Sequence, residues 1–112
     1  GGGKGKMAAV AIGALVGAFA GNEIGKSLDK ADHIALENAG EQARTAPIGK
    51  TIDWSNPKSG NSGTVTPVRE GRHTGSGNYC REFKQTVTID GRTKEAFRIA
   101  CRQPDGSWKI TS

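Results

Sequence analysis

The chain has 112 residues, of which 34% are hydrophobic and 17 are glycine. These numbers limit it to one modest domain with an appendage, whose small core needs support from a disulfide, from oligomerisation or from a membrane. The formal net charge is +5, and all of the excess lies after residue 46, because residues 1–46 hold five basic and five acidic groups whereas residues 47–112 hold eleven and six. A basic segment can meet nucleic acid, anionic lipid or envelope phosphates, but an ordinary solvated surface explains it equally well.

The chain opens with GGGKGK and no initiator methionine, which we interpret as a mature or trimmed product. The run from Met7 to Ala20 contains no charged or strongly polar side chain. As a helix this run is about 21 Å long, which is shorter than the roughly 30 Å hydrocarbon core of a bilayer. Extending it to Ile24 includes Asn22 and Glu23. We therefore expect a helix that lies on a membrane or packs with others in it, rather than a lone span.

Glycine recurs at every fourth position of this apolar segment, at Gly13, Gly17, Gly21 and Gly25. Each internal glycine weakens a helix by roughly 1 kcal/mol relative to alanine. In lipid the same spacing forms a flat groove that allows close helix packing. We therefore predict a glycine-zipper helix that packs with copies of itself or with a partner. The alternative is a flexible linker or a remnant of a signal sequence.

Residues 27–45, SLDKADHIALENAGEQART, predict a water-exposed amphipathic helix. Ser27 is either the N-cap of this helix or a continuation point after Gly25. The expected apolar stripe consists of Leu28, Ala31, Ala35 and Ala39. Gly40 and then Pro47 weaken and end the helix.

After Pro47 the sequence pattern changes to strands and turns. Strands are expected at residues 50–54, 64–70, 79–89, 92–102 and 107–111. Turn-rich stretches at 55–63, 71–78 and 103–106 separate most of them. Pro67 places the second strand toward a sheet edge, because proline cannot donate a hydrogen bond to a neighbouring strand.

The dipeptide Asp90-Gly91 between two β-rich runs is typical of a two-residue type I′ hairpin. If Ile89 pairs with Arg92, counting back along the hairpin places Cys80 opposite Cys101 at a non-hydrogen-bonded pair, where a disulfide fits. We predict this disulfide over two free thiols in chance register. It closes roughly 20 residues, contributes on the order of 3 kcal/mol, and indicates an oxidising compartment.

In this register, basic and apolar side chains share one face of the hairpin. The basic residues are Arg81, Arg92, Lys94, Arg98 and Arg102, and the apolar ones are Tyr79, Phe83, Val87 and Ile89. Either the arginine stems lie along the apolar surface, or a bulge shifts the register. Arg81, Arg98 and Arg102 form a candidate anion-binding face, and the alternative is a solvated sheet face.

No pattern indicates an enzyme, a cofactor or a metal ion. Cys80 and Cys101 form no CxxC, and His33 and His73 lack ligand spacing. The glycine-rich GSGN and GGGKGK lack the strand–helix context and the GK[ST] ending of a phosphate loop. We therefore expect no catalytic residues, no cofactor and no small-molecule substrate.

Several pieces of the C-terminal part resemble the rickettsial 17-kDa surface antigen family. They are Trp54-Ser55-Asn56-Pro57 with Ser59-Gly60, then Gly63 through Pro67, YCREF from Tyr79 to Phe83, and CRQPDGSW from Cys101 to Trp108. The glycine repeat resembles the zipper segment that precedes this domain in the family. The resemblance implies a small outer-membrane lipoprotein with no established biochemical activity. Members carry a lipidated cysteine upstream, and no cysteine precedes Cys80 here, so either that part lies outside this sequence or this member is not lipidated.

We therefore expect an α+β fold in two parts. Residues 1–46 form the glycine-zipper segment, with the option that its helix continues into the amphipathic one. Residues 47–112 form a small antiparallel β-sheet domain stapled by one disulfide. The expected role is a structural or interaction protein of the bacterial outer membrane, exposed to periplasm or surface and partnered by the membrane and by copies of itself or an envelope protein. The alternatives are an oligomeric pore, or a basic β module that binds anionic envelope polymers or, less favoured, nucleic acid.

Overall fold

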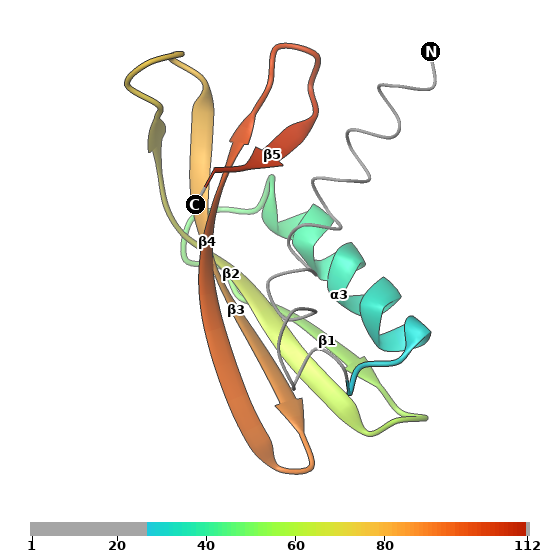
Figure 1. Cartoon of the computed structure of the whole chain (residues 1–112). Coiled ribbons are helices and arrows are strands. Elements are labelled where there is room, and N and C mark those ends of the chain that lie inside the picture. Colours follow the sequence, from blue (N-terminus) through green and yellow to red (C-terminus); the bar gives the residue numbers. More distant parts are fainter. Residues whose placement is uncertain (1–26, 112) are drawn as a thin grey trace.

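The computed structural model describes residues 27–111, which form one helix packed on one face of a five-stranded antiparallel sheet (Figure 1). The elements are α3 (Lys30–Ala43), β1 (Ile52–Asn56), β2 (Asn61–Arg72), β3 (Tyr79–Ile89), β4 (Arg92–Arg102) and β5 (Trp108–Ile110). The strands lie in the sheet in chain order. The helix, the antiparallel sheet and the disulfide of the expected α+β fold are confirmed. The predicted glycine-zipper helix, with Gly13, Gly17, Gly21 and Gly25, lies outside the described residues.

Helix α3 begins two residues later than the expected N-cap indicates. Its N-cap is Asp29 rather than Ser27, and Asp29 and Asp32 form a reciprocal capping box. The buried face also differs from the predicted stripe, since Ala31 is exposed and Asp32 is completely buried. A hydrophobicity pattern assigns aspartate to the solvent side. It therefore predicts the wrong buried face for α3, in which a hydrogen-bonded carboxylate is buried.

The β3–β4 hairpin has the predicted ends and the predicted register. Ile89 pairs with Arg92, and Cys80 pairs with Cys101, with no shift between them. Asp90 and Gly91 both have positive φ, 52° and 76°, as a type I′ turn requires. The alternative of a bulge in this hairpin is therefore wrong.

Strand β2 is longer than predicted and does not lie at the sheet edge, because β1 and β3 flank it. Its proline is tolerated because β1 pairs with β2 only as far as Val65. Pro67 lies beyond this point, where the register with β3 also shifts, and its carbonyl accepts a hydrogen bond from the Gly49 N–H. The prediction of an edge strand was thus wrong for β2 as a whole.

The hydrophobic core joins the helix to the sheet. One cluster of buried residues contains Leu28, Leu36, Ala39, Ala43 and Ala46 together with residues of the sheet, among them Val65, Phe83 and Trp108. The domain boundary predicted between residues 46 and 47 runs through this shared core. Within residues 27–111, no helix is long and apolar enough to cross a membrane.

Candidate functional site

The buried carboxylate of Asp32 ties the start of α3 to the turn between β1 and β2. Its oxygens accept hydrogen bonds of 2.8 Å from the side chains of three residues on or beside that turn, which are Asn56, Ser59 and Asn61. A fourth, of 2.9 Å, comes from the main-chain N–H of Asp29. The carboxylate is completely buried, and these donors replace the water that it loses.

The pKa of Asp32 reflects two opposing effects. Burial acts to raise it, because a buried carboxylate loses hydration in its charged form. The hydrogen bonds from Asp29, Asn61, Ser59 and Asn56 together outweigh burial and hold the pKa of Asp32 below its ordinary value. The carboxylate is therefore charged in the folded protein at neutral pH.

A buried arginine holds the other end of α3. Arg81 on β3 is only 8% exposed, and its Nη1 donates to the carbonyl oxygens of Ala43, at 2.9 Å, and Ala46. Its Nε donates to the Tyr79 hydroxyl, which in turn donates to Glu70. A guanidinium satisfies the orphan carbonyls of a helix C-terminus and complements its dipole. These contacts engage Nη1 and Nε of the side chain that the sequence suggested as an anion-binding residue.

The other two candidate anion-binding residues lie on β4, and one of them, Arg102, shares the Tyr79 ring with Arg81, whose guanidinium is 5.7 Å from the ring centroid. The guanidinium of Arg102 lies over the Tyr79 ring, 5.4 Å from its centroid. Arg98 pairs with the completely buried Phe83, and its Nη1 donates to the carbonyl of its own neighbour, Phe97. On β3, Phe83 and Val87 are thus buried, whereas the basic residues of β4 are half-buried or exposed.

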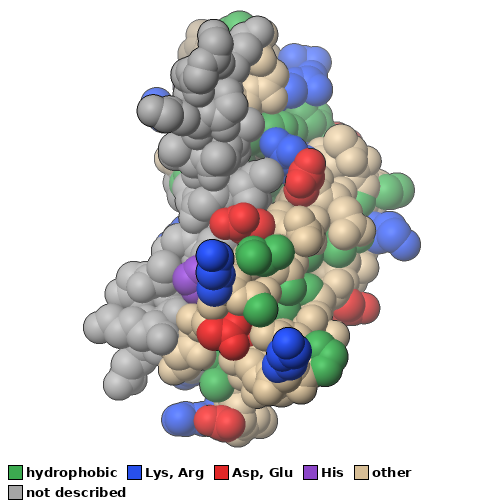
Figure 2. Space-filling view, turned by 90° about the vertical axis from the view of Figure 1, so that its right-hand side faces the viewer, with side chains coloured by type: hydrophobic (Ala, Val, Ile, Leu, Met, Phe, Trp, Pro, Cys, Tyr) green, Lys and Arg blue, Asp and Glu red, His purple; other side chains and the backbone are tan. Residues whose placement is uncertain are grey.

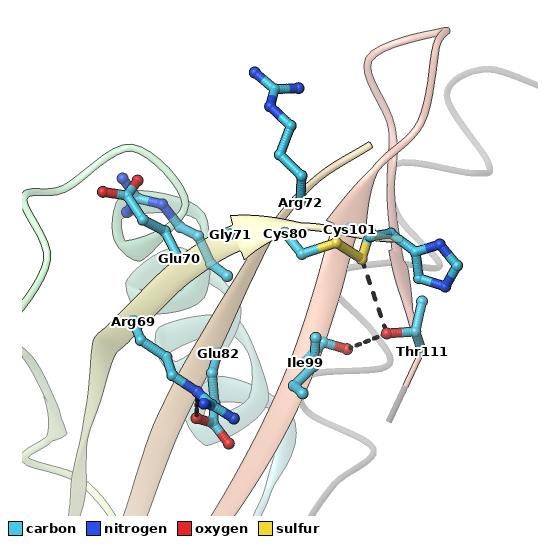
Figure 3. A pocket seen from close by; sticks show the side chains of 11 residues that line it. Arg69, Glu70, Gly71, Arg72, Cys80, Glu82, Ile99, Cys101 and Thr111 are labelled. Atoms are coloured by element: carbon cyan, nitrogen blue, oxygen red, sulfur yellow. Dashed lines mark hydrogen bonds and ion pairs between the residues drawn. A yellow bond between two sulfur atoms is a disulfide. The ribbon is translucent and has the colours of Figure 1, made fainter. Parts of the chain in front are cut away.

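The disulfide lies on the face of the hairpin opposite the Arg81 side chain, because successive strand residues point to opposite faces. Cys80 and Cys101 are bonded, with their Cα atoms 3.9 Å apart, so this sequence prediction is confirmed. The disulfide, Ile99 and Gly71 border a shallow cavity of about 300 Å³ (Figure 3). On its rim Arg69 forms a 2.6 Å ion pair with Glu82, which leaves the lining mixed in charge.

Two further observations limit the chemistry of the described surface. The α3 side of the molecule carries acidic and basic side chains interspersed rather than segregated (Figure 2). Within residues 27–111, no group of three or more His, Cys, Asp or Glu side chains is placed to hold a metal ion. His73 accepts hydrogen bonds from the main-chain N–H groups of Gly75 and Ser76 in its own loop.

Sequence reasoning missed the roles of Asp32 and Arg81. The spacing Asp29-x-x-Asp32 is a capping-box signal that could have located the start of α3. Nothing local indicates that Asp32 meets Asn61, which is 29 residues away, or that Arg81 meets Ala43.

This arrangement, a helix held at both ends on a disulfide-stapled sheet, defines a small α+β domain. The family model of the 17 kDa outer membrane surface antigen matches residues 41–109, and the chain belongs to this family. The chain is 45% identical over 113 residues to the "17 kDa surface antigen" of Rickettsia bellii (strain RML369-C), covering all of this chain and 70% of that protein.

Other relatives with the same name align with a smaller part of this chain. The proteins of Rickettsia conorii (strain ATCC VR-613 / Malish 7) and Rickettsia prowazekii (strain Madrid E) are 44% and 45% identical over 76% and 75% of this chain. The match spans about half of each of these relatives, 54% and 53%. No solved structure matches the chain. Two of the motifs that resemble the family now have structural roles, since Asn56 and Ser59 of the first donate to Asp32 and YCREF supplies Tyr79, Cys80 and Arg81.

Proposed function

We propose that the chain is a non-enzymatic structural or interaction protein of the bacterial outer membrane. Residues 1–26 pack through their glycines in or on the membrane, with copies of the chain or an envelope protein. The domain described by residues 27–111 is exposed to the periplasm or the surface. The Cys80–Cys101 disulfide carries the proposal, because such a bond persists in oxidising compartments and the chain belongs to a surface antigen family.

The way in which the buried charged groups of the domain are bonded supports a scaffold role. The buried charged side chains, Asp32 and Arg81, are both engaged by partners within the fold. A catalytic group needs a reacting position within its reach, and these two groups are occupied by α3 and by the β1–β2 turn.

The proposal is tested by extraction and native mass measurement after secretion of the chain into the periplasm of a Gram-negative host. We expect the protein to sediment with membranes, to require detergent for release, and to have the mass of an oligomer or of a complex. A monomer released by a detergent-free wash would contradict the proposal.

The glycine spacing is tested by a matched pair of variants. Gly17→Leu with Gly21→Leu fills the expected groove, whereas Ala14→Leu with Ala18→Leu places the same two side chains at other positions of the same apolar run. Only the glycine pair is expected to reduce the mass to that of the monomer. Equal loss in both pairs would show that the glycines are not the packing surface.

A further inference from the structure

Strand β4 has a long free edge. Strand β5 pairs only with Ala100, Cys101 and Arg102. Residues 92–99 therefore have no strand beside them on the side away from β3 within the described part of the chain. This free edge of β4 is roughly 27 Å long at about 3.4 Å per residue. A strand of this length is a template for an additional strand.

The register shows which main-chain groups point outward. The Ile89–Arg92 pair flanks the two-residue turn, so Arg92 and every second residue after it bond to β3. The N–H and C=O groups of Thr93, Glu95 and Phe97 then point toward the free edge. The Ile99 carbonyl has this same direction, and it accepts the Thr111 N–H at 2.9 Å. At Phe97 the Arg98 side chain donates to the carbonyl at 3.0 Å, where a neighbouring strand would otherwise donate.

The side chains along this edge have one sign of charge on one face. Arg92, Lys94 and Arg98 share the face toward α3, and none of them forms an ion pair with another described residue. The opposite face carries Phe97, which is 48% exposed, and Glu95, which pairs with Lys84. The edge thus combines outward main-chain groups with no strand beside them, a basic row and one exposed aromatic ring.

We propose that the free edge of β4 binds an extended acidic segment of a partner protein, which adds a sixth strand to the sheet. Main-chain hydrogen bonds to Thr93, Glu95 and Phe97 provide the binding, and acidic side chains at alternate positions face Arg92, Lys94 and Arg98. A second copy of the chain fits poorly, because pairing β4 with β4 places two basic rows side by side. This inference rests on the proposed interaction role and names the kind of partner.

The test uses the full chain and two fluorescent nine-residue peptides, one alternating glutamate with valine and one alternating lysine with valine. We expect the acidic peptide to bind at least about tenfold more tightly than the basic one, with an affinity that falls as salt rises. Binding should also slow amide hydrogen exchange at Thr93, Glu95 and Phe97.

Two variants at one position separate strand addition from simple charge attraction. Glu95→Pro removes an outward N–H and leaves the bonds to β3 in place, whereas Glu95→Ala removes only the side chain. We expect Glu95→Pro to weaken acidic-peptide binding about tenfold and Glu95→Ala to change it less than about twofold. If Glu95→Pro fails to fold, Thr93→Pro, with the same N–H direction, replaces it.

Three results would overturn the proposal. Equal binding of the two peptides would remove the acidic preference. Equal affinities of the proline and alanine variants would show that no strand is added. Self-association that Glu95→Pro abolishes would identify a second copy as the occupant. None of these measurements involves membranes, so a failure here leaves the zipper proposal standing, and a failed extraction experiment leaves this one standing.

Discussion

Asp32 illustrates how this small domain uses a charge in its interior. Three side chains from one turn and one main-chain N–H surround a single carboxylate. A buried charge is tolerated only with such compensation, and removing the compensated group leaves the donors without an acceptor. Asp32 therefore determines both where α3 begins and how it is seated on the β1–β2 turn.

Replacing Asp32 with asparagine should lower the free energy of unfolding at pH 7 by about 3 kcal/mol, since amide donors would face the donors of Asn56 and Asn61. Asp53→Asn is the matched control, because Asp53 is exposed on β1. Denaturant unfolding measures both. A loss at Asp32 no larger than that at Asp53 would contradict the role assigned to the network.

The same carboxylate predicts a pH dependence. Because its pKa is lower in the folded protein than the ordinary value of 3.8, the folded state favours the charged form. Its contribution to stability is complete above the unfolded pKa and is lost as the pH falls through the folded pKa. The difference in unfolding free energy between the native chain and Asp32→Asn should therefore shrink below about pH 4. A difference that stays constant down to pH 2 would contradict the lowered pKa.

Gly63 lies where two strands and an indole ring meet. A methyl group there would overlap the Thr86 carbonyl oxygen and lie 2.6 Å from Nε1 of Trp54. We expect Gly63→Ala to lower the free energy of unfolding by about 1–3 kcal/mol through overpacking. Gly71→Ala, in the same strand with open space around it, is the control and should change stability little. Thermal unfolding of the two variants tests this prediction, and equal melting temperatures would contradict the expected clash.

At the scale of the elements, α3 is held by its ends as much as by its apolar face. Its buried hydrophobic side chains are few, chiefly Leu36, Ala39 and Ala43. The Asp32 network holds the N-terminal end, and Arg81 from β3 holds the C-terminal end. Such a helix depends on polar contacts with distant strands because its own apolar stripe is thin.

Arg81→Met is expected to lower the free energy of unfolding by about 2 kcal/mol, because it leaves the Ala43 and Ala46 carbonyls without their donor. Arg81→Lys should lose less, since an ammonium group can still reach one carbonyl. Arg98→Met serves as the control, because Arg98 donates only to its neighbour. Hydrogen exchange in the last turn of α3 reports the effect directly, and unchanged exchange there in Arg81→Met would contradict it.

The elements were predictable to different degrees, for physical reasons. Strands β3 and β4 were predicted to the residue because the Asp90-Gly91 turn fixes their register, and the register then places Cys80 opposite Cys101. The buried face of α3 was mispredicted because Asp32 is stabilised by residues more than 20 positions away. Arg81 was predicted to lie on an exposed sheet face, because the sequence does not show that the C-terminal end of α3 packs against this side chain.

At the scale of the whole domain formed by residues 27–111, α3 covers one face of the sheet, and the disulfide joins β3 to β4 on the other face. The bond links the hairpin at the end far from its turn, where strands would otherwise separate first. Replacing both cysteines with alanine should lower the free energy of unfolding by about 3 kcal/mol, the value expected for a closed loop of this length. For a domain with so small a core this is a large share of the total stability.

Unfolding measured with and without a thiol reductant tests this prediction. The reductant should lower the melting temperature of the native chain and leave that of the double alanine variant unchanged, which excludes any other effect of the reagent. A native chain insensitive to reduction, with two free thiols detected after denaturation without reductant, would mean that the bond is absent. The inference of an oxidising compartment, and with it the strongest support for the envelope role, would then be lost.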